Sequence, residues 1–307
     1  MADWRSQRCR GVGYARVSGA SGCANHTKPD GKLNHRWGTS QMRRDGLSAR
    51  DPLPNHDAEG QDAASFAAEH ELELGVPSLL WGPGQARRVR LIEKQIPLAG
   101  RRILDIGCGV GQYVAHLRSL PATVVGIDID PGRLGDAGVA GLLAADAEHL
   151  PFAPHSFDVV ILNEVIEHMA DPRAALREIA VQLSARGHVV IYAPNRWFPF
   201  ETHGVRWRGR YRFGNFPFVN WLPRTVRDRL VPHADVYTRG DLRRMFQGLP
   251  YRVRSASAVY PAFDGVRSRN EILGRTLQAT LHRAERTPLR WLGLSHFIIL
   301  ERDERAS

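Results

Sequence analysis

The sequence predicts an α/β protein in which a mostly parallel β-sheet carries helices on both faces. Residues 103–111 form an apolar strand that runs into a glycine-rich turn. Residues 157–162 form a continuous apolar run, which is typical of a strand buried on both faces. Such strands alternate with helical segments up to residue 193, and this alternation favours right-handed βαβ units and a parallel sheet.

Each expected element follows from hydrophobic periodicity and from the residues that start or stop it. The expected strands cover residues 102–106, 123–128, 141–145, 157–162, 188–193, 251–259 and 295–301. Helices are expected over residues 85–95, 112–119, 239–247 and 272–284. A further helix begins after Asp171, because aspartate is a good N-cap and Pro172 suits the first turn.

Two stretches stand apart from this alternation. Residues 1–62 are basic and rich in Gly, Ser, Arg and Asn, with no sustained apolar period, so we expect a disordered extension before a domain spanning 63–307. Residues 195–232 hold nine aromatic residues, eight arginines and two acids, and we expect them to form an insertion that caps the acceptor side of the site.

Composition narrows the function classes. The net charge is +10, but the first 50 residues hold ten Lys or Arg and only three Asp or Glu, so the body is close to neutral and disfavours nucleic acid as a partner. Three scattered cysteines suggest a reducing compartment, and we expect a cytoplasmic protein. Lysine occurs three times against 39 arginines, which suggests a GC-rich, bacterial coding bias.

The glycine-rich turn predicts a nucleotide-like cofactor at the carboxyl edge of the sheet. Gly107, Gly109 and Gly111 let the backbone approach a ligand closely, and Asp128 ends the following strand, where a carboxylate can bind ribose hydroxyls. A nicotinamide dinucleotide is the alternative, but its fingerprint needs a glycine where this chain has Gln112.

Five motifs in this order resemble the class I S-adenosylmethionine-dependent methyltransferases of the type 11 group. They are Leu-Asp-Ile-Gly-Cys-Gly-Val-Gly (104–111), Gly-Ile-Asp-Ile (126–129), Ala-Asp-Ala-Glu-His-Leu-Pro-Phe (145–152), Ser-Phe-Asp-Val-Val (156–160) and Asn-Glu-Val-Ile-Glu-His (163–168). The resemblance implies a Rossmann-like sheet of seven strands with an antiparallel last strand. It also implies S-adenosylmethionine as the cofactor.

The resemblance assigns cofactor contacts by position. Gly107, Gly109 and Gly111 would surround the methionine part, with Asp105 near its ammonium group and the main chain of Asn163 beside it. Asp128 would hold the ribose. The adenine would contact Ile129, Asp146 and Ala147.

Glu164, Glu167, His168 and the distal His233 are the candidates for chemistry on the acceptor. The spacing of the first three places them on one side of a helical turn after the strand at 157–162. The arrangement resembles the ubiquinone-biosynthesis O-methyltransferases and, more distantly, small-RNA 2′-O-methyltransferases, where it implies a divalent metal held by all four residues. A metal-free base, His168 or His233 with Glu164 nearby, and a purely structural role stay open. His203 is a further acceptor-site candidate.

These observations predict an O-methyltransferase for a small or lipid-linked hydroxyl acceptor. The arginines and tryptophans of 195–232 favour peripheral contact with a membrane surface. An RNA-directed methyltransferase and a non-catalytic S-adenosylmethionine-binding protein are the alternatives.

Overall fold

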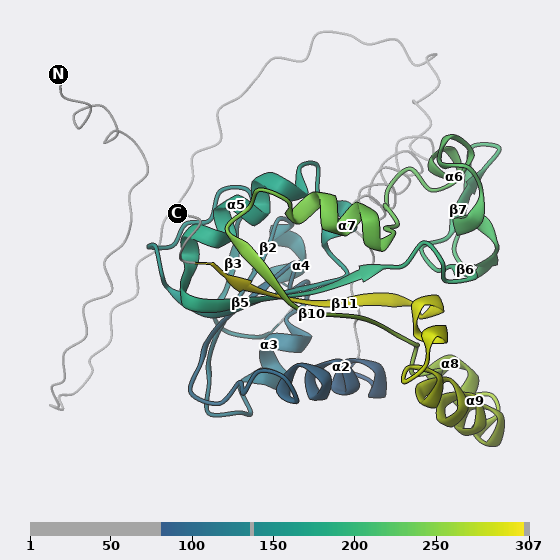
Figure 1. The fold of residues 1–307 in the computed structure, drawn as a ribbon, viewed down its shortest axis with the longest axis horizontal. Helices are drawn as coiled ribbons and strands as arrows, with labels where there is room; N and C mark the ends of the chain where they lie inside the picture. Colours follow the sequence, from purple (N-terminus) through teal and green to yellow (C-terminus); the bar gives the residue numbers. More distant parts are fainter. Residues whose placement is uncertain (1–80, 136–137, 304–307) are drawn as a thin grey trace, which may run out of the picture. The chain divides into compact units, whose positions relative to one another are not determined.

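A computed structural model describes residues 81–135 and 138–303, and its centre is a seven-stranded sheet (Figure 1). The strands are β1 (Arg102–Ile106), β2 (Thr123–Asp128), β3 (Leu142–Ala144), β4 (Phe157–Asn163), β5 (Leu183–Pro194), β10 (Tyr251–Val259) and β11 (Ser295–Arg302). Their spatial order is β10-β11-β5-β4-β1-β2-β3. Strand β11 runs antiparallel to both neighbours, whereas β1 to β5 pair in parallel, so the predicted fold class is confirmed.

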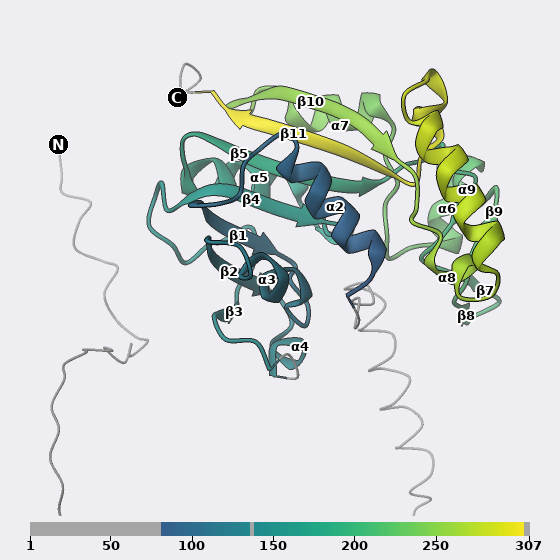
Figure 2. The same ribbon diagram turned by 90° about the horizontal axis from the view of Figure 1, so that it is seen from below.

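Helices cover both faces of the sheet (Figure 2). One face carries α5 (Pro172–Gln182) and α7 (Arg239–Phe246), and the other carries α2 (Pro83–Glu93) and α3 (Gln112–Leu117). A short helix, α4 (Pro131–Gly135), follows β2.

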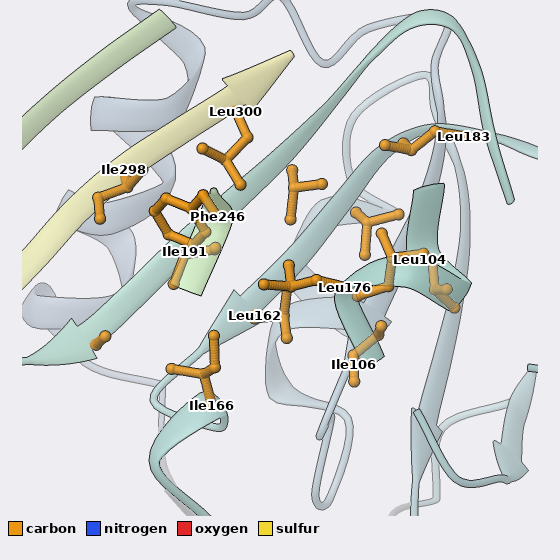
Figure 3. Packing of buried hydrophobic residues seen from close by; sticks show 14 of the residues in the cluster. Leu104, Ile106, Leu162, Ile166, Leu176, Leu183, Ile191, Phe246, Ile298 and Leu300 are labelled. Carbon is orange, nitrogen blue, oxygen red and sulfur yellow. The ribbon is translucent and has the colours of Figure 1, made fainter. Parts of the chain in front are cut away.

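Strand residues alternate between the two cores, as the pleat of a strand requires. Leu104 and Ile106 belong to one buried cluster that also contains Leu176 of α5 and Phe246 of α7 (Figure 3). Ile103, which directly precedes Leu104, packs on the opposite face with the residues of α2 and α3. The central strands are therefore buried on both sides, which is why their sequences read as continuous apolar runs.

Two segments lie beyond the carboxyl ends of the parallel strands, where ligands bind in open α/β sheets (Figure 1). The first, which we call the cap, is the predicted insertion 195–232. It contains the strand pairs β6 (Phe200–Glu201) with β9 (Phe216–Pro217) and β7 (Val205–Trp207) with β8 (Arg210–Arg212), then a short 3-10 turn η2 (Val219–Trp221) and α6 (Arg224–Leu230). The second contains α8 (Asp264–Arg267), α9 (Glu271–Ala284) and the 3-10 turn η3 (Pro288–Leu292).

Apart from shifts of one or two residues at element ends, the structure departs from the expected elements at two points. Strand β5 begins at Leu183 and not at 188, because its first residues already pair with the start of β4. Residues 164–168 do not form one helical turn: Glu164 has a φ of 56°, and only Ile166–His168 form a 3-10 helix, η1. The expected disordered segment 1–62 lies outside the described residues, and within those residues no helix is long and apolar enough to cross a membrane.

Candidate functional site

The glycine turn after β1 is held so tightly that its first residue has no room for a side chain. Gly107 has a φ of 68°, in the left-handed region that disfavours other residues, and an added Cβ would lie 2.4 Å from Val165 Cγ2. Gly109 and Gly111 also have positive φ values. The turn therefore leaves backbone N–H groups close to any ligand at the end of β1.

Two buried carboxylates flank this turn. Asp128 Oδ2 accepts a hydrogen bond from the backbone N–H of Gly109 at 2.8 Å, and its Oδ1 accepts one from the N–H of Asp130 at 3.0 Å. Asp105 Oδ2 is buried without a hydrogen-bond partner in the described part of the chain. Burial and the charge of Asp128 raise the pKa of Asp105 to about 8. A cation is the ligand that would suit this pair.

A single large cavity, about 1490 Å³ in volume, contains most of the residues predicted to bind the cofactor. Those that line it are Gly107, Gly109, Asp128, Ile129, Asp146, Ala147 and Asn163. Asp105 and Gly111 are not among the lining residues. Ile129 is 58% exposed, as expected of an apolar side chain left for a ligand to cover. Asp146 accepts the backbone N–H of Glu148 with Oδ1 at 2.9 Å.

Arg88 of α2 is a cavity residue that sequence reasoning missed. Its guanidinium donates to Asn163 Oδ1, to Glu164 Oε1 at 2.7 Å and to Ser295 Oγ at 3.0 Å, and it stacks over the ring of Tyr192. Burial raises the pKa of Glu164, but the charge of Arg88 and the hydrogen bond from Ser295 outweigh it and keep that pKa below its usual range. Glu164 is therefore an anion whose side chain is already engaged.

Elsewhere in the lining of the cavity, Glu167, His168 and His203 form one cluster. One ligand atom from each lies within 4.8 Å of the other two. His168 Nδ1 lies 2.8 Å from the carbonyl oxygen of His233, and His203 Nδ1 lies 2.8 Å from Glu201 Oε1. Both histidines can therefore donate through Nδ1 and keep Nε2 for a ligand.

The charge state of the cluster follows from its burial. Both carboxylate oxygens of Glu167 are buried without a hydrogen-bond partner among the described residues. Burial, then the charge of Glu164, raises the pKa of Glu167 well above its usual value. Burial, helped by His203, lowers the pKa of His168 to about 4. An unsatisfied carboxyl beside two imidazoles that can each offer Nε2 fits a divalent metal, which would hold the carboxylate ionised.

The structure brings together only part of the predicted metal set. Glu167 and His168 are in the cluster, but Glu164 is paired with Arg88 and His233 contributes only its carbonyl oxygen. The ring of His233 turns away: Nε2 lies 3.3 Å from the carbonyl oxygen of His203, and His233 does not line the cavity. The side chain that completes the cluster comes from the cap.

The similarity to a known protein family lies in the part of the chain that precedes the cap. A family profile described as "Methyltransferase domain" matches residues 104–191, which contain the glycine turn and η1. The match supports the predicted class, an S-adenosylmethionine-dependent methyltransferase.

The likeness to curated proteins covers only part of the chain. The chain is 36% identical over 137 residues to the ubiquinone biosynthesis O-methyltransferase of Azorhizobium caulinodans, covering 39% of this chain and 54% of that protein. It is 33% identical over 124 residues to the protein of the same name from Marinobacter nauticus, covering 36% and 50%. The chain thus spans about half the length of these curated relatives.

A solved structure of an S-adenosylmethionine-dependent methyltransferase from Mesorhizobium loti resembles this one with a TM-score of 0.49 and 18% identity. The match covers 72% of this chain and 99% of that one.

Proposed function

We propose that this protein transfers a methyl group from S-adenosylmethionine to a hydroxyl group of a small or lipid-linked acceptor. The observation that carries the proposal is the cavity, which joins the glycine turn and Asp128 at one end to the Glu167–His168–His203 cluster at the other. Its volume of about 1490 Å³ exceeds that of ordinary single-ligand pockets, about 300–1000 Å³, so it has room for donor and acceptor together.

The charges along the cavity suit a cationic donor. S-adenosylmethionine supplies a methyl group already activated on a sulfonium. Asp128, fixed by the amides of Gly109 and Asp130, would orient the ribose, and the buried Asp105 would face the ammonium end. Arg88 places a guanidinium beside Asn163, where it would favour the carboxylate of the methionine part. The transfer is an in-line displacement, so these residues act mainly by positioning and by excluding water.

The acceptor end supplies the groups that a hydroxyl needs. An acceptor hydroxyl must lose its proton as its oxygen attacks the methyl carbon. A divalent metal bound by Glu167, His168 and His203 would lower the pKa of such a hydroxyl. The cluster lines the same cavity as the cofactor residues, so an acceptor held there lies in the same enclosed space as the donor.

The walls of the acceptor end are mostly apolar, which supports an acceptor with an aromatic or lipid-like part. Leu273, Leu277 and Leu281 of α9 recur at a spacing of four, and all three line the cavity. Phe198 and Phe200 of the cap line it as well.

Peripheral contact with a membrane is supported by the hairpin of β7 and β8. Its exposed arginines are Arg206, Arg208, Arg210 and Arg212. Trp207 is 55% exposed within this row, and Phe213, directly after it, is 71% exposed. Basic side chains interleaved with exposed aromatic rings are typical of surfaces that lie on anionic lipid. We expect the protein to co-sediment with vesicles containing anionic lipid and not with neutral vesicles.

RNA is the second candidate acceptor, because the same arginines and aromatic rings would suit a nucleic acid. The two partners separate in a binding assay with purified RNA and vesicles. Retention on RNA that falls steeply with salt, together with no vesicle binding, would favour the RNA acceptor.

The test of the proposed function is methyl transfer from isotopically labelled S-adenosylmethionine to cell extracts, read by mass spectrometry. A labelled product with a new methyl ether is expected. Asp128→Ala should abolish donor binding in calorimetry, whereas Asp130→Ala, two residues along and outside the cavity lining, should keep it. Donor binding without any labelled product would favour the non-catalytic alternative.

A further inference from the structure

His203 reaches the cluster through a buried ion pair inside the cap. Glu201, which is 0% exposed, accepts hydrogen bonds on Oε1 from both the backbone N–H and Nδ1 of His203, each at 2.8 Å. Its other oxygen accepts from Arg227 Nη2 at 2.9 Å. Arg227 comes from α6 and is 1% exposed. One carboxylate thus links a fully buried guanidinium to an imidazole that lines the cavity.

Stability alone does not explain why the cap contains this buried ion pair. Burying two charges costs several kcal/mol per ion before their attraction is counted, and apolar residues of similar size often stabilise a fold as well. Arg227 also donates to the carbonyl oxygens of Val231 and Ala234, so it fixes the segment between α6 and His233. The network therefore joins β6, α6 and the following loop around His203.

The hydrogen bonds decide which nitrogen of His203 faces the cavity. Because Nδ1 faces Glu201, Nε2 is left toward Glu167, whose Oε1 lies 3.9 Å away. His168 is arranged in the same way, with Nδ1 facing the carbonyl oxygen of His233. A carboxylate or carbonyl acceptor on the second ring nitrogen is the usual support of a metal-binding histidine.

We propose that Glu201 and Arg227 are positioning residues that make His203 the third ligand of a divalent metal, in place of His233. The inference rests on the proposed function only in placing this metal at the acceptor end of the same cavity. Two imidazole nitrogens and one carboxylate favour Zn²⁺, Mn²⁺, Fe²⁺ or Co²⁺ over the all-oxygen sites that Mg²⁺ and Ca²⁺ prefer.

The test measures metal binding directly, without methyl transfer. The full chain, stripped with a chelator, is titrated with Co²⁺ and with Mn²⁺ by calorimetry, and the Co²⁺ complex is also followed by its visible absorption. Wild type should bind one ion. His203→Ala should weaken binding by more than about 100-fold, since an outer-shell partner alone contributes about 10- to 100-fold.

His233→Ala is the matched control. It removes the ring predicted from the sequence but keeps the backbone carbonyl that holds His168, so metal affinity should stay within about threefold of wild type. Glu201→Gln keeps the size of the side chain and removes its charge, and should weaken binding by about 10- to 100-fold.

Melting temperatures and donor binding distinguish a folding defect from a failure of the metal-site inference. Glu201→Gln leaves Arg227 buried without its counter-charge, so the double variant Glu201→Gln with Arg227→Met is measured too, with melting temperatures for all proteins. It should fold and still bind Co²⁺ more weakly than wild type. Wild type that binds no ion, or His203→Ala that binds as tightly as His233→Ala, would overturn the inference. Calorimetry with S-adenosylmethionine, which depends on Asp128, tests the proposed function independently.

Discussion

Binding of S-adenosylmethionine should remove a proton from Asp105. This carboxyl is 2% exposed, its Oδ2 has no partner among the described residues, and its pKa is raised to about 8 by burial and by Asp128. At pH 7 about nine in ten free molecules therefore carry a protonated Asp105. A cofactor ammonium placed nearby favours the ionised form. Binding at pH 7 should then release about 0.9 proton per site from this group.

Calorimetry in two buffers of different ionisation enthalpy measures this release. Asp105→Asn has the same shape and no ionisable proton, so the difference between wild type and variant cancels the ionisation of the cofactor itself. Relative to the variant, wild-type affinity should rise about tenfold per pH unit well below pH 8 and level off above it. Equal proton release by the two proteins would refute the reasoning.

The raised pKa of Asp105 also determines how its contribution to folding stability changes with pH. Because the folded carboxyl keeps its proton to higher pH than the unfolded one, its contribution to stability is greatest at low pH. That contribution is lost as the pH rises to about 8. Above that pH, Asp105→Asn should therefore unfold at a higher temperature than wild type.

Three further changes have defined outcomes. Gly107→Ala should destabilise the fold by about 1–3 kcal/mol and abolish S-adenosylmethionine binding, because the added Cβ would lie 2.4 Å from a methyl carbon of Val165. The control is Gly100→Ala, since Gly100 has a similar φ but open space around it, and calorimetry should show normal binding by this variant. Arg88→Met leaves Glu164 without its partly buried counter-charge and should cost about 1–3 kcal/mol in urea unfolding. A loss below about 1 kcal/mol would be that of a solvent-exposed pair. Trp207→Ser should reduce co-sedimentation with anionic vesicles several-fold while donor affinity stays unchanged, and unchanged sedimentation would exclude the hairpin as the contact.

The sheet was predictable because each strand is a short apolar run bounded by residues that end it. Strands β2 and β10 occupy the residues expected for them, Thr123–Asp128 and Tyr251–Val259. The first is an apolar run between a loop and the acid that ends it, and the second precedes a proline-containing loop. The start of β5 was predicted five residues too late, because Leu183 fits the apolar pattern of α5. Only its pairing with Phe157 of β4 makes Leu183 part of a strand.

The acceptor end was harder to predict because it is assembled by tertiary contacts. Arg88 sits in an arginine-rich helix, where a solvent-exposed role is the ordinary expectation, and only the structure places it against Glu164. The assumption that Glu164, Glu167 and His168 share one helical face fails because Glu164 has a positive φ. His203 and Glu201 are separated by one residue, but nothing in that spacing predicts that Arg227 lies behind them.

The two ends of the cavity differ in how far the sequence predicts them, because they are built from different groups. The donor end consists of backbone amides and strand-end carboxylates, so a short motif fixes both its position and its ligand. The proposed acceptor end takes side chains from η1, the cap and α9, which are far apart in sequence and meet only in the folded chain. In this protein the cap brings an imidazole, a buried ion pair and an arginine-rich hairpin to the same end of the sheet. The cap is therefore the segment whose variants should change acceptor, metal and membrane properties while donor affinity stays the same.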